Sequence, residues 1–113
     1  MKKKIIVVGA VTIALMGAMP APASAHIERG LNCHIIGRPE QLSNHRVKIR
    51  WRITNRTQQT RDILCVARVE SDTHRRLMGE QARVLGRHFV ERSTVARLPG
   101  TLESARVVHG HFV

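Results

Sequence analysis

Apolar and polar residues alternate in short runs along most of the chain, which is the pattern of half-buried β-strands rather than of helices. The clearest run spans residues 46–54, where apolar residues share one parity and cations share the other. Residues 62–70 are apolar on both parities, which predicts a central strand covered on both faces. Weaker patterns of the same kind predict strands over residues 31–37, 77–86, 88–98 and 102–113.

Turn residues separate these runs. Residues 71–76 are polar, Pro99 and Gly100 suit a type II turn, and we interpret the glycosylation-type triplet that begins at Asn55 as a further turn. A short helix over residues 79–87 is the one alternative to a strand, since Glu, Gln, Ala, Arg and Leu are good helix formers. The pattern as a whole predicts a small all-β sandwich or barrel.

The order of the motifs resembles two known groups of β-sandwich. A strand ending in "ITNRT", the apolar strand "ILCVARVESD", a turn and a later "LPGT" are similar to the small extracytoplasmic modules of the FxLYD type, over residues 47–113. Cys33, Trp51 and Cys65 follow the Cys–Trp–Cys order of immunoglobulin domains. The resemblance implies an immunoglobulin-like antiparallel sandwich of five to seven strands. FxLYD modules are mostly non-enzymatic domains of exported bacterial proteins, so the likeness implies a fold more than a function.

The first residues have the three parts of a secretory signal peptide. Lys2, Lys3 and Lys4 form a basic segment, an apolar run follows over residues 5–16, and a small-x-small cleavage site ends at Ala25. The apolar run is shorter than the ~20 residues that a membrane-spanning helix needs. We therefore expect a cleaved signal peptide over residues 1–25 and one secreted or periplasmic domain over residues 26–113, with no transmembrane segment in the mature chain.

Two cysteines, Cys33 and Cys65, belong to the mature part. In an exported protein a lone pair predicts a disulfide. The loop that it closes corresponds to roughly 3–4 kcal/mol in the chain-entropy model. The rival interpretation, two metal thiolates, requires further ligands at tight spacing such as C-x-x-C, and the sequence contains none.

The mature part is strongly basic. Three of the 19 Lys and Arg lie in the expected leader, which leaves 16 against 8 Asp and Glu, a net charge of +8. A basic exported domain is expected to meet anions, with solubility alone as the competing interpretation. Motifs of nucleophile elbows, S-x-x-K serines and phosphate-binding glycine loops are absent from the sequence. We therefore expect a binding protein and not an enzyme.

The cations of residues 46–54 are Arg46, Lys48, Arg50 and Arg52, with no acid between them. On a strand they form a ladder about 20 Å long at ~3.3 Å per residue. We predict an anion-binding face, whose partner is a cell-envelope polymer, a membrane surface or an acidic protein. Nucleic acid is not expected, because the only nearby aromatic residue has the opposite parity and cannot stack bases. The competing interpretation is the solvated side of a strand, where cations also block edge pairing.

The seven histidines carry the alternative function. His109 and His111 share one face of a strand, where two imidazoles suit Cu(II) or Zn(II). Cleavage after Ala25 makes His26 the amino terminus, whose amine and imidazole together chelate copper, whereas cleavage after Ala23 gives a Ser-Ala-His terminus that also binds Cu(II). The alternative is thus an extracytoplasmic copper- or zinc-binding protein that uses His26, His109 and His111. Against it, isolated H-x-H pairs are common without any metal.

Overall fold

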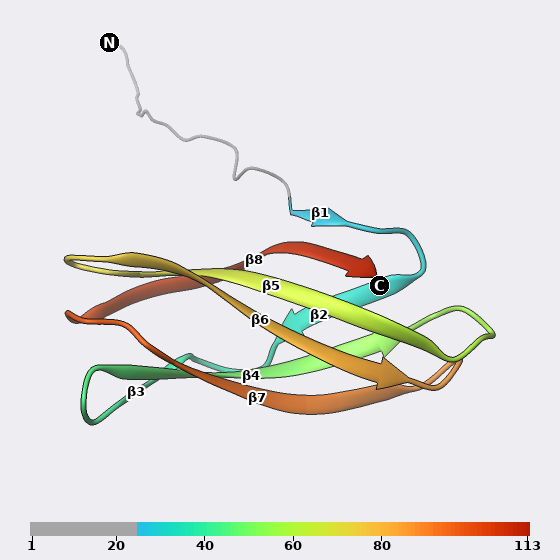
Figure 1. Ribbon diagram of the computed structural model, residues 1–113, viewed down its shortest axis with the longest axis horizontal. Coiled ribbons are helices and arrows are strands. Elements are labelled where there is room, and N and C mark those ends of the chain that lie inside the picture. The colour runs from blue at the N-terminus through green and yellow to red at the C-terminus, as the bar shows by residue number, and fades with distance from the viewer. Residues whose placement is uncertain (1–24) are drawn as a thin grey trace, which may run out of the picture.

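Eight strands build the domain, and a computed structural model describes residues 25–113 (Figure 1). In chain order they are β1 (His26–Ile27), β2 (Leu31–Ile35), β3 (Glu40–Leu42), β4 (Arg46–Asn55), β5 (Arg61–Ser71), β6 (Arg75–Val84), β7 (Phe89–Arg97) and β8 (Leu102–Phe112). Within this range there is no helix, hence none long and apolar enough to cross a membrane. The expected signal peptide lies outside the described residues, except for Ala25.

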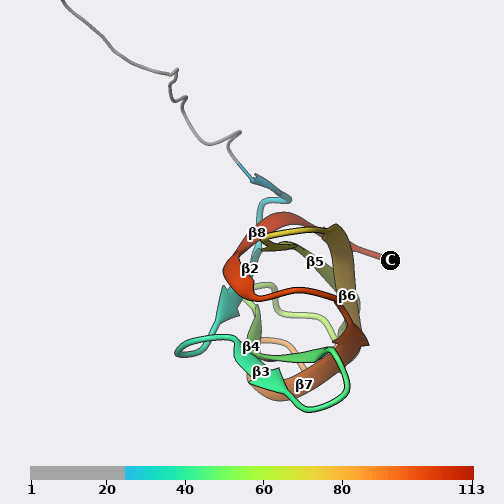
Figure 2. The same ribbon diagram turned by 90° about the vertical axis from the view of Figure 1, so that its left-hand side faces the viewer.

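The strands form two sheets that face each other, as the end-on view shows (Figure 2). One sheet has the order β1-β8-β5-β6, and in the other β4 lies between β7 on one side and β2 and β3 on the other. The expected all-β class is confirmed. Two details of the expectation are wrong: residues 25–113 contain eight strands instead of five to seven, and β1 pairs with β8 in parallel, so the first sheet is mixed.

β4 follows the alternation of its sequence. Its core-facing residues are fully buried: Val47, Ile49, Trp51 and Ile53. The parity assigned from the sequence is therefore confirmed. Each such side chain, moved out of water, contributes about 1.5–3 kcal/mol to folding, so a one-residue slip of this strand would expose the whole set.

β5 is the central strand of its sheet, as expected, but only one of its faces is covered. Ile63, Cys65 and Val69 are fully buried, whereas Leu64 and Val66 on the other parity are half-exposed. The prediction that both faces are covered is wrong. A two-layer domain gives each antiparallel sheet one packed face and leaves the other to solvent.

The helix considered over residues 79–87 is also wrong, because β6 continues to Val84. Met78, Ala82 and Val84 are buried at alternate positions of this strand. Its backbone pairs with β5 from Arg75 to Val84. Sheet pairing and alternate burial therefore outweigh the helix propensity of the polar residues between them.

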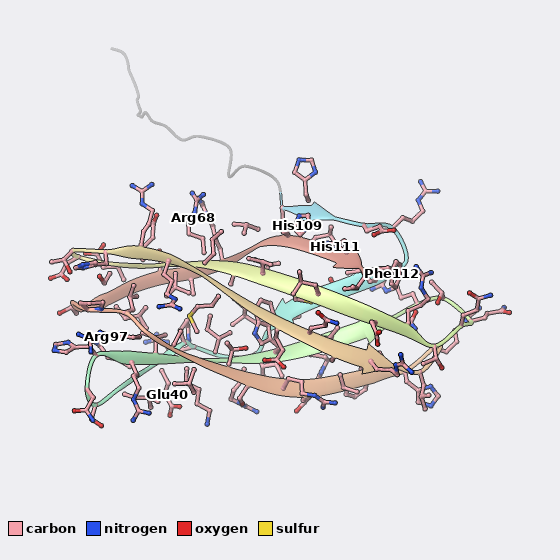
Figure 3. The ribbon with its side chains drawn as sticks, viewed as in Figure 1. Glu40, Arg68, Arg97, His109, His111 and Phe112 are labelled. Atoms are coloured by element: carbon pink, nitrogen blue, oxygen red, sulfur yellow. A yellow bond between two sulfur atoms is a disulfide. The ribbon has the colours of Figure 1, made fainter. Side chains whose placement is uncertain are left out.

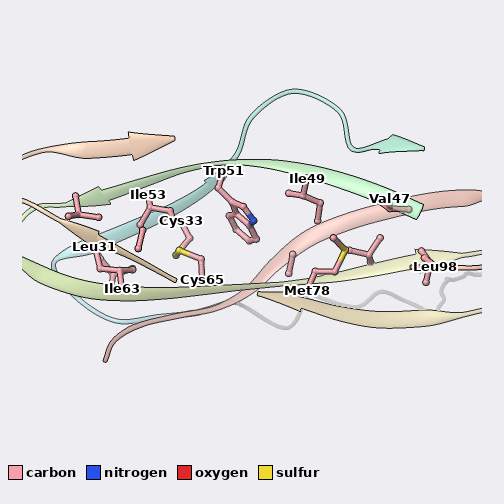
Figure 4. Packing of buried hydrophobic residues seen from close by; sticks show 14 residues of the cluster. Leu31, Cys33, Val47, Ile49, Trp51, Ile53, Ile63, Cys65, Met78 and Leu98 are labelled. Atoms are coloured by element: carbon pink, nitrogen blue, oxygen red, sulfur yellow. A yellow bond between two sulfur atoms is a disulfide. The ribbon is translucent and has the colours of Figure 1, made fainter. Parts of the chain in front are cut away.

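The disulfide between Cys33 of β2 and Cys65 of β5 is confirmed and links the two sheets, with an S–S distance of 2.00 Å. Both cysteines of the chain are thus in the bond, which rules out the alternative of two metal thiolates. Trp51 lies beside the disulfide in the core (Figure 4). Its Nε1 donates to Thr94 Oγ1 at 3.2 Å, so the indole is held from the neighbouring strand.

The turn after β4 is organised by Asn55, which is fully buried. Its side-chain nitrogen donates to the carbonyls of Gln59 at 2.7 Å and Val84 at 2.9 Å. Its side-chain oxygen accepts from the backbone N–H and the hydroxyl of Thr57 at 2.9 and 2.7 Å. The glycosylation-type triplet is therefore a turn, as interpreted, since the amide that a glycan would modify is occupied inside the fold.

Candidate functional site

The row of cations lies on the solvent-facing side of β4. Arg46, Arg50 and Arg52 are exposed and Lys48 is half-buried. Because β4 has neighbours on both sides, the row runs along the middle of a sheet face rather than along an edge. The interpretation of these cations as edge-blocking residues is therefore wrong, whereas the choice between a solvated face and a binding face stays open.

Neighbouring strands add both signs of charge to this face. Opposite the row, in register, lie Arg97 and Glu91 of β7 and Glu40 of β3. Figure 3 labels Glu40 and Arg97, which lie towards the same end of the sandwich. Together with the row, the face carries five cations and two carboxylates. We name this set of seven residues the basic face.

The four cations of the row are not equivalent. Arg52 is paired with Glu91, with an N–O distance of 2.7 Å, and its guanidinium lies 4.8 Å from the centre of the Phe89 ring. The described residues contain two other ion pairs, Arg75–Glu70 and Arg83–Asp62, and neither includes Lys48 or Arg50. Lys48 and Arg50 therefore form no ion pair among the described residues, although Glu40 is the register partner of Lys48.

The three candidate metal ligands lie on the other sheet, facing away from the basic face. β1 pairs with β8 so that His26 lies directly opposite His109. His109 Nε2 and His111 Nδ1 are 2.5 Å apart and share a hydrogen bond. Figure 3 shows this histidine pair on the side of the molecule opposite to Glu40. Among the described residues, no group of three or more His, Cys, Asp or Glu side chains is already arranged to hold a metal ion.

A further arginine group was not singled out from the sequence. Arg68 of β5 lies opposite Arg106 of β8, on the same outer face as the histidines. A shallow hollow beside them is lined by Arg68, Arg75, Arg76 and Leu77. In the sequence these arginines are single residues of separate strands. Only the register of β5, β6 and β8 shows that they are neighbours.

Asp62 and Arg83 form an ion pair in which the pKa of each group is shifted. Arg83 Nε and Nη2 donate to the two carboxylate oxygens of Asp62 at 3.0 and 3.3 Å. These hydrogen bonds hold the pKa of Asp62 below its ordinary value and raise the pKa of Arg83. The pair joins β5 to β6 across the sheet and faces solvent, so we assign it a structural role.

A comparison with family models, with curated proteins and with solved structures finds no match to this chain. The resemblance to FxLYD and immunoglobulin-like domains therefore stays a prediction. The functional proposal rests on the basic face and its surroundings.

Proposed function

We propose that this protein is an exported, immunoglobulin-like β-sandwich domain that acts by binding a linear anionic polymer of the cell envelope along its basic face. What supports the proposal is the position of Lys48 and Arg50 in a row of four cations along the middle of a sheet face, with neither of them in an ion pair of the described residues.

The shape of the basic face favours a chain-like ligand over a small one. From Arg46 to Arg52 the cations follow one strand for about 20 Å, at ~3.3 Å per residue. They lie on a sheet surface, and none of them lines any of three hollows formed by other described residues. A polymer that carries a phosphate or carboxylate at each repeat places successive anions along such a row.

A membrane surface and a nucleic acid fit this face less well. The exposed apolar side chains beside the row are Val95 and Phe89, and Phe89 stays 54% exposed with the Arg52 guanidinium 4.8 Å from the centre of its ring. Two separate side chains do not form the broad apolar face that enters a bilayer interface. The rings on the described face are Phe89 and the imidazole of His34, both near Arg52, which leaves no row of rings along the strand to stack bases.

The location is compatible with this proposal. A disulfide between the sheets is typical of proteins that work in an oxidising, extracytoplasmic compartment. It also fixes the two sheets relative to each other. A rigid face loses little conformational freedom when a flexible polymer binds to it.

The experiment is a binding titration with poly(glycerol phosphate), a linear phosphodiester polymer, using the double variant Lys48→Gln/Arg50→Gln. Basic residues close to an anionic surface contribute about 1 kcal/mol each, so the loss of two corresponds to a roughly 30-fold weaker affinity at low salt. Binding by the unmodified protein should weaken steeply between 0.1 and 1 M salt, because the Debye length falls from about 10 Å to about 3 Å.

The matched control is Arg38→Gln/Arg56→Gln, which removes the same net charge from two exposed loop positions outside every ion pair of the described residues. The proposal expects the control to bind within about threefold of the unmodified protein. Equal losses in both variants would show that net charge alone drives binding. Anionic vesicles in a parallel titration separate a polymer from a membrane: the proposal expects weaker binding to the vesicles.

A further inference from the structure

We propose that His26, His109 and His111 form a binding site for a divalent metal ion that prefers imidazole nitrogen, Cu(II) above Zn(II). The site lies on the outer face of the sheet β1-β8-β5-β6 and is independent of the basic face. It requires only the three side chains, and therefore does not depend on where the leader is cleaved.

The pairing of β1 with β8 brings the three histidines together. Neighbouring strands lie about 4.7–4.9 Å apart, and His26 is the register partner of His109. Residues at alternate positions of one strand share a face, and so His111 lies on the same side of β8 as His109. The three imidazoles therefore belong to neighbouring positions on one face of the sheet, one on β1 and two on β8.

Glu28 fixes this register. Its backbone N–H donates to the carbonyl of Gly110 at 2.8 Å, and its carboxylate accepts from the backbone N–H of Phe112 at 3.0 Å. Ile27 lies opposite Gly110 and packs against the core. These contacts hold the short β1 against β8, although two residues alone make few backbone bonds. The carboxylate also places a negative charge at the same sheet edge, which offsets part of the repulsion between a cation and a basic domain.

The two ring nitrogens of His109 and His111 already converge on one point. The two nitrogens are 2.5 Å apart and share a hydrogen bond. Two Zn–N bonds of about 2.0–2.1 Å at a tetrahedral angle require roughly 3.3 Å between the nitrogens. Both rings are half-exposed, so a small side-chain rotation provides the difference, and the metal takes the place of the proton, which is released.

His26 becomes the third ligand when its side chain turns towards His109 and His111. It is exposed, and within residues 25–113 it is not yet assembled with the other two into a ligand group. On β5, Leu64 and Val66 lie opposite His111 and His109 and border the site with apolar atoms. Three imidazoles beside an apolar border suit Cu(II) or Zn(II), with water or a chain terminus in the remaining position, and the Irving–Williams order places Cu(II) first.

The test is a titration with Cu(II) alone, followed by calorimetry, of the protein purified after export, with its amino terminus read from its intact mass. We expect one equivalent of Cu(II) per chain and weaker binding of Zn(II). Because loss of an outer-shell partner already costs 10–100-fold in metal affinity, His109→Ala/His111→Ala should cost at least ~100-fold. The matched control His34→Ala/His74→Ala removes two exposed histidines from other parts of the fold and should bind as the unmodified protein does.

Chemical blocking of the amino terminus distinguishes the three-imidazole site from chelation by the chain end. We expect the blocked protein to keep its affinity within about tenfold. Unchanged affinity in His109→Ala/His111→Ala, or loss of binding on blocking alone, would overturn the proposal, and so would an unchanged affinity in His26→Ala. Should the double variant not fold, Cu(II)-induced broadening of histidine ring signals in the unmodified protein decides: broadening confined to His26, His109 and His111 supports the site, and broadening elsewhere or none overturns it.

Discussion

Gly110 of β8 lies next to the disulfide in the core and next to the two histidines in the sequence. It lies between His109 and His111, opposite Cys65 in the register of β5 and β8. A Cβ atom added at Gly110 would lie 2.7 Å from the Sγ of Cys33, 3.1 Å from Leu31 Cδ1 and 3.2 Å from Ile27 Cδ1. The first distance is well inside van der Waals contact. The core therefore requires a residue without a side chain here, and Gly110→Ala must displace the disulfide or the strand.

The size of the effect follows from steric overlap alone, because Gly110 is not among the glycines of the described range with positive φ. Overpacking of a close-packed core typically costs 1–3 kcal/mol. For a domain of this length each kcal/mol corresponds to about 4–8 °C in Tm. We expect Gly110→Ala to lower the Tm by at least about 4 °C.

Gly79→Ala is the matched control. Gly79 lies on β6 in the same sheet, and its added Cβ would meet its nearest neighbours at 3.5–3.7 Å, which is ordinary contact. Both changes remove the same chain entropy from the unfolded state, which stabilises by about 0.4–1 kcal/mol where the native backbone allows it. That contribution cancels in the comparison. Gly79→Ala should be neutral or slightly stabilising.

The assay is urea and thermal unfolding followed by circular dichroism under oxidising conditions, repeated with Cys33 and Cys65 both changed to alanine. Without the Sγ atom most of the overlap disappears, so the cost of Gly110→Ala should fall by about 0.5–3 kcal/mol, the usual range of coupling between residues in contact. Equal stability of Gly110→Ala and Gly79→Ala, within about 0.5 kcal/mol, would show that an added methyl group at Gly110 causes no steric overlap. A cost that is the same with and without the disulfide would refute the assignment to Cys33.

Three further outcomes are expected. Asn55→Asp should destabilise the domain more than an exposed substitution does, by about 1–3 kcal/mol, because a carboxylate cannot donate to the carbonyls of Gln59 and Val84 and places a charge inside the fold; urea unfolding measures it. The pKa of Asp62, read by NMR, should lie below 3.8 and rise in Arg83→Gln. This interaction stabilises the fold above the unfolded-state pKa, and its contribution disappears as the pH falls through the folded-state pKa. Arg50→Gln should weaken poly(glycerol phosphate) binding more than Arg52→Gln, since Arg52 is already neutralised by an acid; equal losses in the same titration would contradict this.

The long strands could be predicted from sequence because their burial is periodic. In β4 every second residue is fully buried, so the alternation of apolar and charged side chains identifies the strand and its core-facing side. β1 and β3 are two and three residues long. So short a segment has no measurable period, and its pairing depends on backbone groups of another strand.

Only those parts of the candidate site that lie on one strand could be predicted from the sequence. The row from Arg46 to Arg52 is visible in the sequence, whereas Glu91 lies 39 positions after Arg52 and becomes its partner only through the register of β4 and β7. The same holds for His26 and His109, which the sequence suggested as co-ligands without any indication of how they meet. Parallel pairing of a two-residue strand provides that contact.

An NMR titration of the backbone amides with poly(glycerol phosphate) distinguishes binding by the basic face from binding driven by net charge. We expect saturable shifts that concentrate on β4 and β7 around Lys48 and Arg50 and that vanish in 1 M salt. The outer face of β5 and β8, including Arg68 and Arg106, should stay unchanged. Shifts that are largest at Arg68 and Arg106, or spread evenly over all exposed arginines, would contradict binding by the basic face.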